Sequence, residues 1–230
     1  MTVNLRLSLT IFKIGFAAEA VGGLVALEAG TSALPFHGLL LYLTPVFSFL
    51  GIVFLWIGRH EWNELHRLRV HHANLAFGVT LIAIGLAALP VALLVATGGA
   101  APAGLKLEFG VAVALIFALT FITYALVAAN LVGPVGRVAI GIGLGWAALV
   151  SGAIGLVLVP QLDPLVRTVL ARSTNLAPIT HPILVPDALL AFSYLAFFVA
   201  FVDAHYRVVK GIGRTGASPP TIVGTGPGSG

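Results

Sequence analysis

The chain alternates between long apolar stretches and short polar connections. Six of the stretches are long enough to cross a hydrocarbon core of about 30 Å, which takes roughly 20 helical residues. The pattern predicts an all-α polytopic membrane protein, a bundle of six transmembrane helices. The expected spans are residues 9–29, 37–58, 74–97, 108–132, 136–159 and 184–206.

The first stretch is the weakest span because Lys13 and Glu19 interrupt it. A secretory signal peptide is the alternative interpretation, with residues 17–20 (AAEA) as the cleavage cue. A lysine inside the apolar region is untypical of such a leader, so a helix that stays in the chain is the favoured interpretation.

The segment before the last stretch, residues 161–175 (QLDPLVRTVLARSTN), has an amphipathic pattern. Asp163 is expected to cap a helix whose first position is Pro164. Arg167 and Arg172 lie away from an apolar face made of Leu165, Val166, Val169 and Leu170. The pattern predicts a short helix that lies in the membrane interface before the last span.

Composition agrees with this class of protein. Hydrophobic residues make up 59% of the 230 and charged residues 9%, whereas about 25% of a soluble domain is charged. The mean hydropathy is +1.06. Residues 1–210 are expected to form the transmembrane domain, and residues 211–230, rich in Gly, Pro, Ser and Thr, a flexible tail. The chain has no cysteine, which excludes disulfides and cysteine-ligated metals.

Basic residues are unequally divided between the two sides of the expected bundle. The richer side holds Arg6, Arg59, Arg67, Arg69, Arg137, Arg207, Lys210 and Arg214, and the other side holds Lys106, Arg167 and Arg172. The positive-inside rule then predicts a multi-pass protein of the cell membrane with both termini and the tail in the cytoplasm. We expect anionic lipid headgroups, rather than nucleic acid, to meet this charge.

Small residues form a regular stripe in the fifth stretch, at steps of four, three, four and three. They are Gly141, Gly145, Ala148, Gly152 and Gly155. Such a stripe lets two helix backbones approach closely in lipid, so we expect it to be a helix-packing face. Ala147 and Val150 lie off the stripe and are expected to tolerate leucine.

Few polar side chains fall inside the spans. Glu19 lies on a face with small residues, where it either locks a helix pair or takes part in a proton or ion path. Thr120, Thr123 and Asn130 give the fourth span a polar face, and Asp203 lies four residues before Arg207. These are the candidates for a path, although such residues commonly bond across helices or to their own carbonyls.

Residues 59–72 (RHEWNELHRLRVHH) form the most polar connection. The run from His60 resembles the H-E-x-x-H metal motif, but Glu64 stands where the second histidine would be. His60 and Glu64 with His71 or His72 could hold a divalent metal.

Haem b is a second possibility for the histidines. It would need a pair such as His37 with His181, or His205 with His71 or His72. The simpler interpretation is that the loop faces lipid headgroups through Arg59, Trp62, Arg67 and Arg69.

These observations leave more than one functional class open. The favoured hypothesis is a non-catalytic subunit or scaffold that packs against other membrane proteins or against itself. The sequence shows no complete catalytic set, so an enzyme is not favoured. The alternatives are a small permease, channel or proton path that uses Glu19, and a redox subunit that binds haem or a metal.

Overall fold

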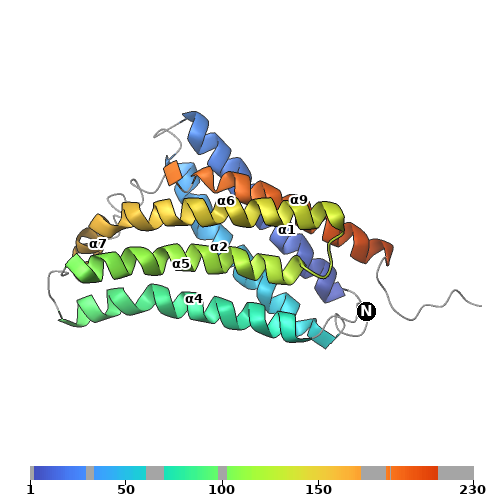
Figure 1. Cartoon of the computed structure of the whole chain (residues 1–230), viewed down its shortest axis with the longest axis horizontal. Helices are drawn as coiled ribbons and strands as arrows, with labels where there is room; N and C mark the ends of the chain where they lie inside the picture. Colours follow the sequence, from blue (N-terminus) through green and yellow to red (C-terminus); the bar gives the residue numbers. More distant parts are fainter. Residues whose placement is uncertain are drawn as a thin grey trace, which may run out of the picture.

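The computed structural model describes residues 3–29, 34–60, 70–97, 103–171, 185–186 and 188–211, and these residues contain helices and turns but no strand. The helix α6 continues through a 3₁₀ turn, η2 (Val159–Gln161), into the short helix α7 (Leu162–Leu170). The long helices are α1 (Val3–Ala29), α2 (Leu34–Ile57), α4 (Val70–Thr97), α5 (Ala103–Ala128), α6 (Pro134–Leu158) and α9 (Ala191–Lys210) (Figure 1).

The long helices follow the apolar stretches of the sequence to within a few residues at most ends. Among the described residues, four apolar segments are long enough to cross a membrane: Asn4–Val25, Gly104–Ala128, Pro134–Thr168 and Ala191–Lys210. In α2 and α4 the described apolar segments are shorter, Val46–Ile57 and His72–Leu86. The all-helical class is therefore confirmed, with four helices able to span, and the count of six spans stays a prediction.

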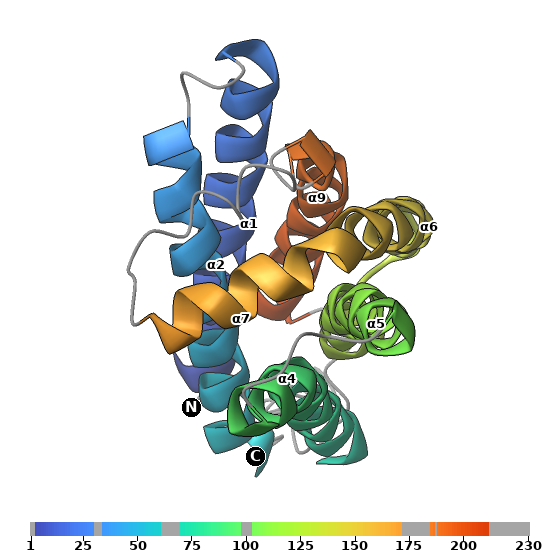
Figure 2. The same ribbon diagram turned by 90° about the vertical axis from the view of Figure 1, so that its left-hand side faces the viewer.

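The long helices form an arc when the bundle is viewed from its end (Figure 2). The order of neighbours is α2, α1, α9, α6, α5 and α4, and α2 meets α4 only weakly. In Figure 1, α1 and α2 cross the direction of α4, α5 and α6 at a large inclination. The inclination brings the middle of α1 against both α5 and α9.

The basic residues lie at the two ends as the sequence predicts. Arg6, Arg59, Arg137, Arg207 and Lys210 belong to the helix ends at which α1 begins and α9 finishes. Lys106 and Arg167 lie at the opposite end, on α5 and α7. The expected separation of charge is thus present among the described residues, which do not include Arg67, Arg69, Arg172 and Arg214. The cytoplasmic location of the richer end stays a prediction.

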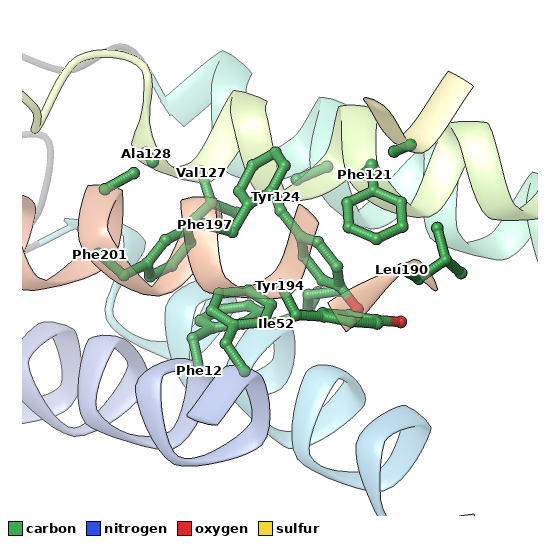
Figure 3. Packing of buried hydrophobic residues seen from close by; sticks show 14 of the residues in the cluster. Phe12, Ile52, Phe121, Tyr124, Val127, Ala128, Leu190, Tyr194, Phe197 and Phe201 are labelled. Atoms are coloured by element: carbon green, nitrogen blue, oxygen red, sulfur yellow. The ribbon is translucent and has the colours of Figure 1, made fainter. Parts of the chain in front are cut away.

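Aromatic side chains fill the centre of the bundle (Figure 3). The ring of Phe16 lies 4.8 Å from that of Tyr124 and 5.0 Å from that of Phe201, measured between centroids. Aromatic pairs add about 0.5–1.5 kcal/mol each beyond the area they bury. The cluster comes from α1, α5 and α9 and comprises Phe12, Phe16, Phe121, Tyr124, Tyr194, Phe197 and Phe201.

Glycines permit the closest helix contacts. At the crossing of α5 and α6, a Cβ added to Gly155 would lie 2.5 Å from the carbonyl oxygen of Gly110. A Cβ on Gly51 of α2 would lie 2.7 Å from the ring of Phe12. Both positions therefore need a residue without a side chain if the neighbouring helices are to keep their separation.

The small-residue stripe of α6 does not pack as a whole against the rest of the chain. Gly155 contacts α5, but Gly141, Gly145 and Gly152 face open space and Ala148 is exposed. The opposite side of α6 faces the protein instead.

Ala147 and Val150 are 1% and 5% exposed, so the expectation that they tolerate leucine is wrong. Periodicity identifies the face but cannot tell which side the neighbouring helices occupy.

The short helix α7 starts differently from the sequence expectation. It follows η2 directly and begins at Leu162, so Asp163 lies in its first turn and is not the N-cap. Asp163 forms an ion pair with Lys106 of α5. Leu162 and Val166 are buried and Arg167 is exposed, as an amphipathic helix requires. Figure 2 shows α7 crossing the end of the bundle; its place in a membrane interface stays a prediction, and residues 212–230 lie outside the described chain.

We expect Gly155→Ala to destabilise the protein by about 1–3 kcal/mol, because its methyl group would meet the backbone of Gly110. The matched control is Gly145→Ala on the same helix, where a Cβ meets open space and alanine favours the helix by about 1 kcal/mol. Unfolding of the purified protein in detergent measures both. Equal effects of the two variants would show that α5 and α6 do not cross at Gly110 and Gly155.

Candidate functional site

Glu19 is the most deeply buried charged residue among those described, with 3% of its surface exposed. The apolar repeat of α1 explains its position: Leu9, Phe12, Phe16 and Ala20 are buried at helical spacing, and Glu19 falls on the same face. A carboxyl group at that depth costs roughly 2.5 kcal/mol or more on insertion scales. Its burial therefore requires polar partners inside the bundle.

Tyr124 of α5 provides a polar group beside this carboxyl. It is 1% exposed, interacts electrostatically with Glu19, and its hydroxyl lies 2.6 Å from Oγ of Ser48 on α2. Glu19, Tyr124 and Ser48, which we call the polar cluster, thus join α1, α5 and α2. Sequence reasoning missed Tyr124 because its ring resembles any aromatic core residue, and its hydroxyl partner is 76 residues away.

The polar cluster permits two kinds of chemistry. A hydroxyl both donates and accepts, so the bond between Ser48 and Tyr124 can run in either direction. A buried cluster whose polar groups all have hydrogen-bond partners specifies which helix faces meet. Because Glu19 interacts electrostatically with Tyr124, its carboxyl could also exchange a proton with the linked hydroxyls, provided that Glu19 changes its protonation state.

The other candidates for an ion path form bonds that do not include Glu19. Thr120 and Thr123 donate to the carbonyls of Ile116 and Leu119 within α5, at 2.8 and 2.9 Å. Bonds of this kind satisfy the hydroxyls within their own helix.

Asn130 and Asp203 lie nearer the basic end of the bundle. Asn130 Nδ2 lies 2.9 Å from Nδ1 of His72, and Asp203 Oδ2 accepts a 2.6 Å bond from the Gly133 amide. A Cβ on Gly133 would lie 2.9 Å from an Arg207 guanidinium nitrogen and 3.4 Å from this carboxylate, so both side chains meet at the start of α6. Their role there is to hold the turn between α5 and α6 against α9.

The histidine-rich connection is described only in part. Glu64 and the headgroup candidates Trp62, Arg67 and Arg69 lie outside the described residues, as does His181. His71 belongs to α4, but neither its side chain nor that of His37 is described. Within the described chain, no three histidine or acidic residues gather as metal ligands. A divalent metal at His60 and Glu64 with His71 or His72, and a haem b, both remain predictions.

Arg59, one of the candidate headgroup residues, packs against Trp56. Its guanidinium lies 4.1 Å from the ring centroid of Trp56 and donates a 2.8 Å bond to the Trp56 carbonyl. The Trp56 ring is 40% exposed and stacks on Phe77 of α4 at 5.9 Å. A tryptophan with an arginine at a helix end is typical of the membrane interface. Trp56, which the sequence analysis did not single out, is therefore a further candidate for the membrane interface.

A groove of about 450 Å³ runs between α5 and α6. One side chain in it is polar: Ser151 is 1% exposed, and its Oγ has no hydrogen-bond partner in the part of the chain that the structure describes. The α6 side of the groove includes Ala148, Ser151, Gly152, Gly155, Leu156 and Val159. The groove thus adjoins the exposed part of the small-residue stripe.

Comparison with protein-family models, with curated proteins and with solved structures gives no match for this chain. The helices themselves define the class, an all-helical protein of integral-membrane type with four helices able to span. A more specific function has to be argued from the two sites described above.

We expect the bond between Ser48 and Tyr124 to stabilise the bundle. In a double-mutant cycle of Ser48→Ala and Tyr124→Phe, the coupling in unfolding free energy should be about 0.6 kcal/mol, up to about 1.7, as found for hydrogen bonds between membrane helices. Tyr206→Phe is the control because Tyr206 is 56% exposed. A coupling of zero would mean that the two hydroxyls do not meet in the folded protein.

Proposed function

We propose that this protein is a non-catalytic subunit of a membrane assembly, and that α6 binds a transmembrane helix of a second subunit. The observation that carries the proposal is the exposed stripe of α6. Gly141, Gly145 and Gly152 have nothing within 4 Å of the place where a side chain would begin. On the same side of the helix, Leu149 and Leu156 are each 72% exposed.

Lipid explains why such a stripe favours a helix as its occupant. Lipid tails are as apolar as leucine, so helices associate in a membrane through close packing and interhelical hydrogen bonds. Gly141 and Gly152 are about three turns apart, which is long enough for a helix crossing. The contact of Gly155 with Gly110 shows the same kind of crossing within this chain.

Ser151 supports the same conclusion from its chemistry. A buried hydroxyl without a partner costs about 1–3 kcal/mol. Ser151 lines the groove together with Ala148 and Gly152, and its hydroxyl is buried there. A neighbouring helix that offers a carbonyl or a hydroxyl there would satisfy it, whereas the methylenes of a lipid tail could not.

Gly145→Leu and Gly152→Leu should each weaken association at least about tenfold, which corresponds to 1.4 kcal/mol, because a branched side chain would hold the partner backbone away. Neither variant should unfold the subunit, because both positions face open space. Ala153→Leu is the matched control, since Ala153 is also exposed but lies on another face of α6. Size-exclusion chromatography with light scattering after mild extraction measures the assembly.

Cross-linking distinguishes a second copy from a different subunit. The natural chain has no cysteine, so Gly145→Cys and Ala153→Cys each place one thiol on α6. Disulfide dimers from the first variant alone would identify a second copy of this chain. Leucine variants that assemble just as the Ala153 control does would contradict the proposal.

A second candidate function is a proton or ion path through Glu19, and the polar cluster is the observation that favours it. Glu19→Gln keeps the shape of the side chain but cannot titrate. If Glu19 carries protons, the amide should abolish pH-dependent flux in proteoliposomes and leave folding intact. Glu108→Gln is the control, since Glu108 is exposed. Flux that survives Glu19→Gln would exclude Glu19 from the path. If the natural protein shows no flux and Glu19→Gln folds unchanged, the structural role of Glu19 is favoured.

A further inference from the structure

Three basic side chains gather where α1 packs against α9. Nζ of Lys13 contacts Nδ1 of His205. Arg6 interacts electrostatically with the same histidine. Arg6 and Lys13 are seven residues apart, which places them on one face of α1, two turns from each other. All three side chains are half-buried. We call these residues the basic cluster.

The described acidic side chains either have other contacts or lie far from the basic cluster. Asp203 accepts the bond from Gly133, and Glu19 lies beside Tyr124. Glu108 and Asp163 belong to the opposite end of the bundle. Lys13 and Arg6, which are both positively charged, act electrostatically on His205.

Arg6 adds an independent observation. Its Nε is buried and has no hydrogen-bond partner in the described chain. A guanidinium is a planar fork of donors that fits phosphate or carboxylate oxygens. A donor of this kind that is removed from water costs free energy until an acceptor reaches it.

The position of the cluster indicates which anion could reach it. His205 lies five residues before the end of α9, about 7.5 Å along the helix. This end of the bundle also carries Arg59, Arg207 and Lys210. Phosphate groups of anionic lipids are met by basic side chains near the ends of membrane helices.

We propose that Arg6, Lys13 and His205 form a binding site for a phosphate group, which a phospholipid headgroup supplies. The guanidinium and the ammonium donate to the phosphate oxygens, and the second ring nitrogen of His205 is a further donor. The bound anion neutralises positive charges that the packing of α1 on α9 holds together. The site is independent of the stripe on α6 and so does not rest on the proposed function.

The test uses the full chain in detergent with a fluorescent phosphatidic acid as the probe. Arg6→Gln and Lys13→Gln should each weaken binding about tenfold, which is the order expected for one charge-assisted contact. Lys13→Arg should keep the affinity for the lipid, because the positive charge is retained. Arg137→Gln is the matched control, because it removes the same charge from an exposed position at the same end. Unfolding temperatures establish that the variants fold, and phosphatidic acid should raise the unfolding temperature of the natural protein by more than that of Lys13→Gln.

Two further arms distinguish the source of the phosphate. A neutral phosphatidylcholine probe should bind without sensitivity to these variants. Displacement of the fluorescent lipid by inorganic phosphate would support the site and identify the free ion as a ligand. An equal loss of binding in Arg6→Gln, Lys13→Gln and Arg137→Gln would overturn the proposal. It would show that binding depends on the net charge of the protein and not on this site.

Discussion

The contact of Phe16 with Tyr124 and Phe201 is the interaction on which the rest of the bundle depends. It joins the inclined helix α1 to α5 and α9 at the level where all three are most deeply buried. Membrane helices gain little from the hydrophobic effect once they are in lipid, so the fit of such rings supplies much of the association. The polar cluster exists because this contact carries Glu19 and Tyr124 to one place.

The two faces of α6 have different neighbours. Its inner face meets α9 and α5, where a Cβ on Gly143 would lie 2.9 Å from the ring of Phe197 and Gly155 meets Gly110. Its outer face carries glycine at positions where the chain offers no neighbour. Glycine weakens a helix by about 1 kcal/mol relative to alanine. Three glycines on an exposed face are therefore a cost that a close-packed partner helix would offset.

The charged side chains are arranged differently at the two ends of the bundle. Ion pairing is clear at the end of the bundle where Lys106 meets Asp163. At the other end, Lys13 contacts His205 in a region rich in basic residues. Water and salt screen partly buried charges less than exposed ones. The anion that we propose at the basic cluster would therefore offset the positive charges of Arg6 and Lys13.

The sequence by itself determined the helical class, the approximate ends of the long helices and the division of basic residues between two ends. Those properties are local: a run of apolar residues has to satisfy its backbone hydrogen bonds internally, whatever surrounds it. Glu19 could also be singled out, because a carboxylate inside an apolar run is costly anywhere.

Only the tertiary structure decided which residues surround Glu19 and which side of α6 is buried. Tyr124 of α5 and Ser48 of α2 meet because α2, like α1, is inclined to α5. The fit of side chains from several helices sets that inclination. The stripe of α6 and the buried residues Ala147 and Val150 have equally apolar neighbours along the chain. Hydropathy cannot separate a face that meets protein from one that meets lipid, because both surroundings are apolar.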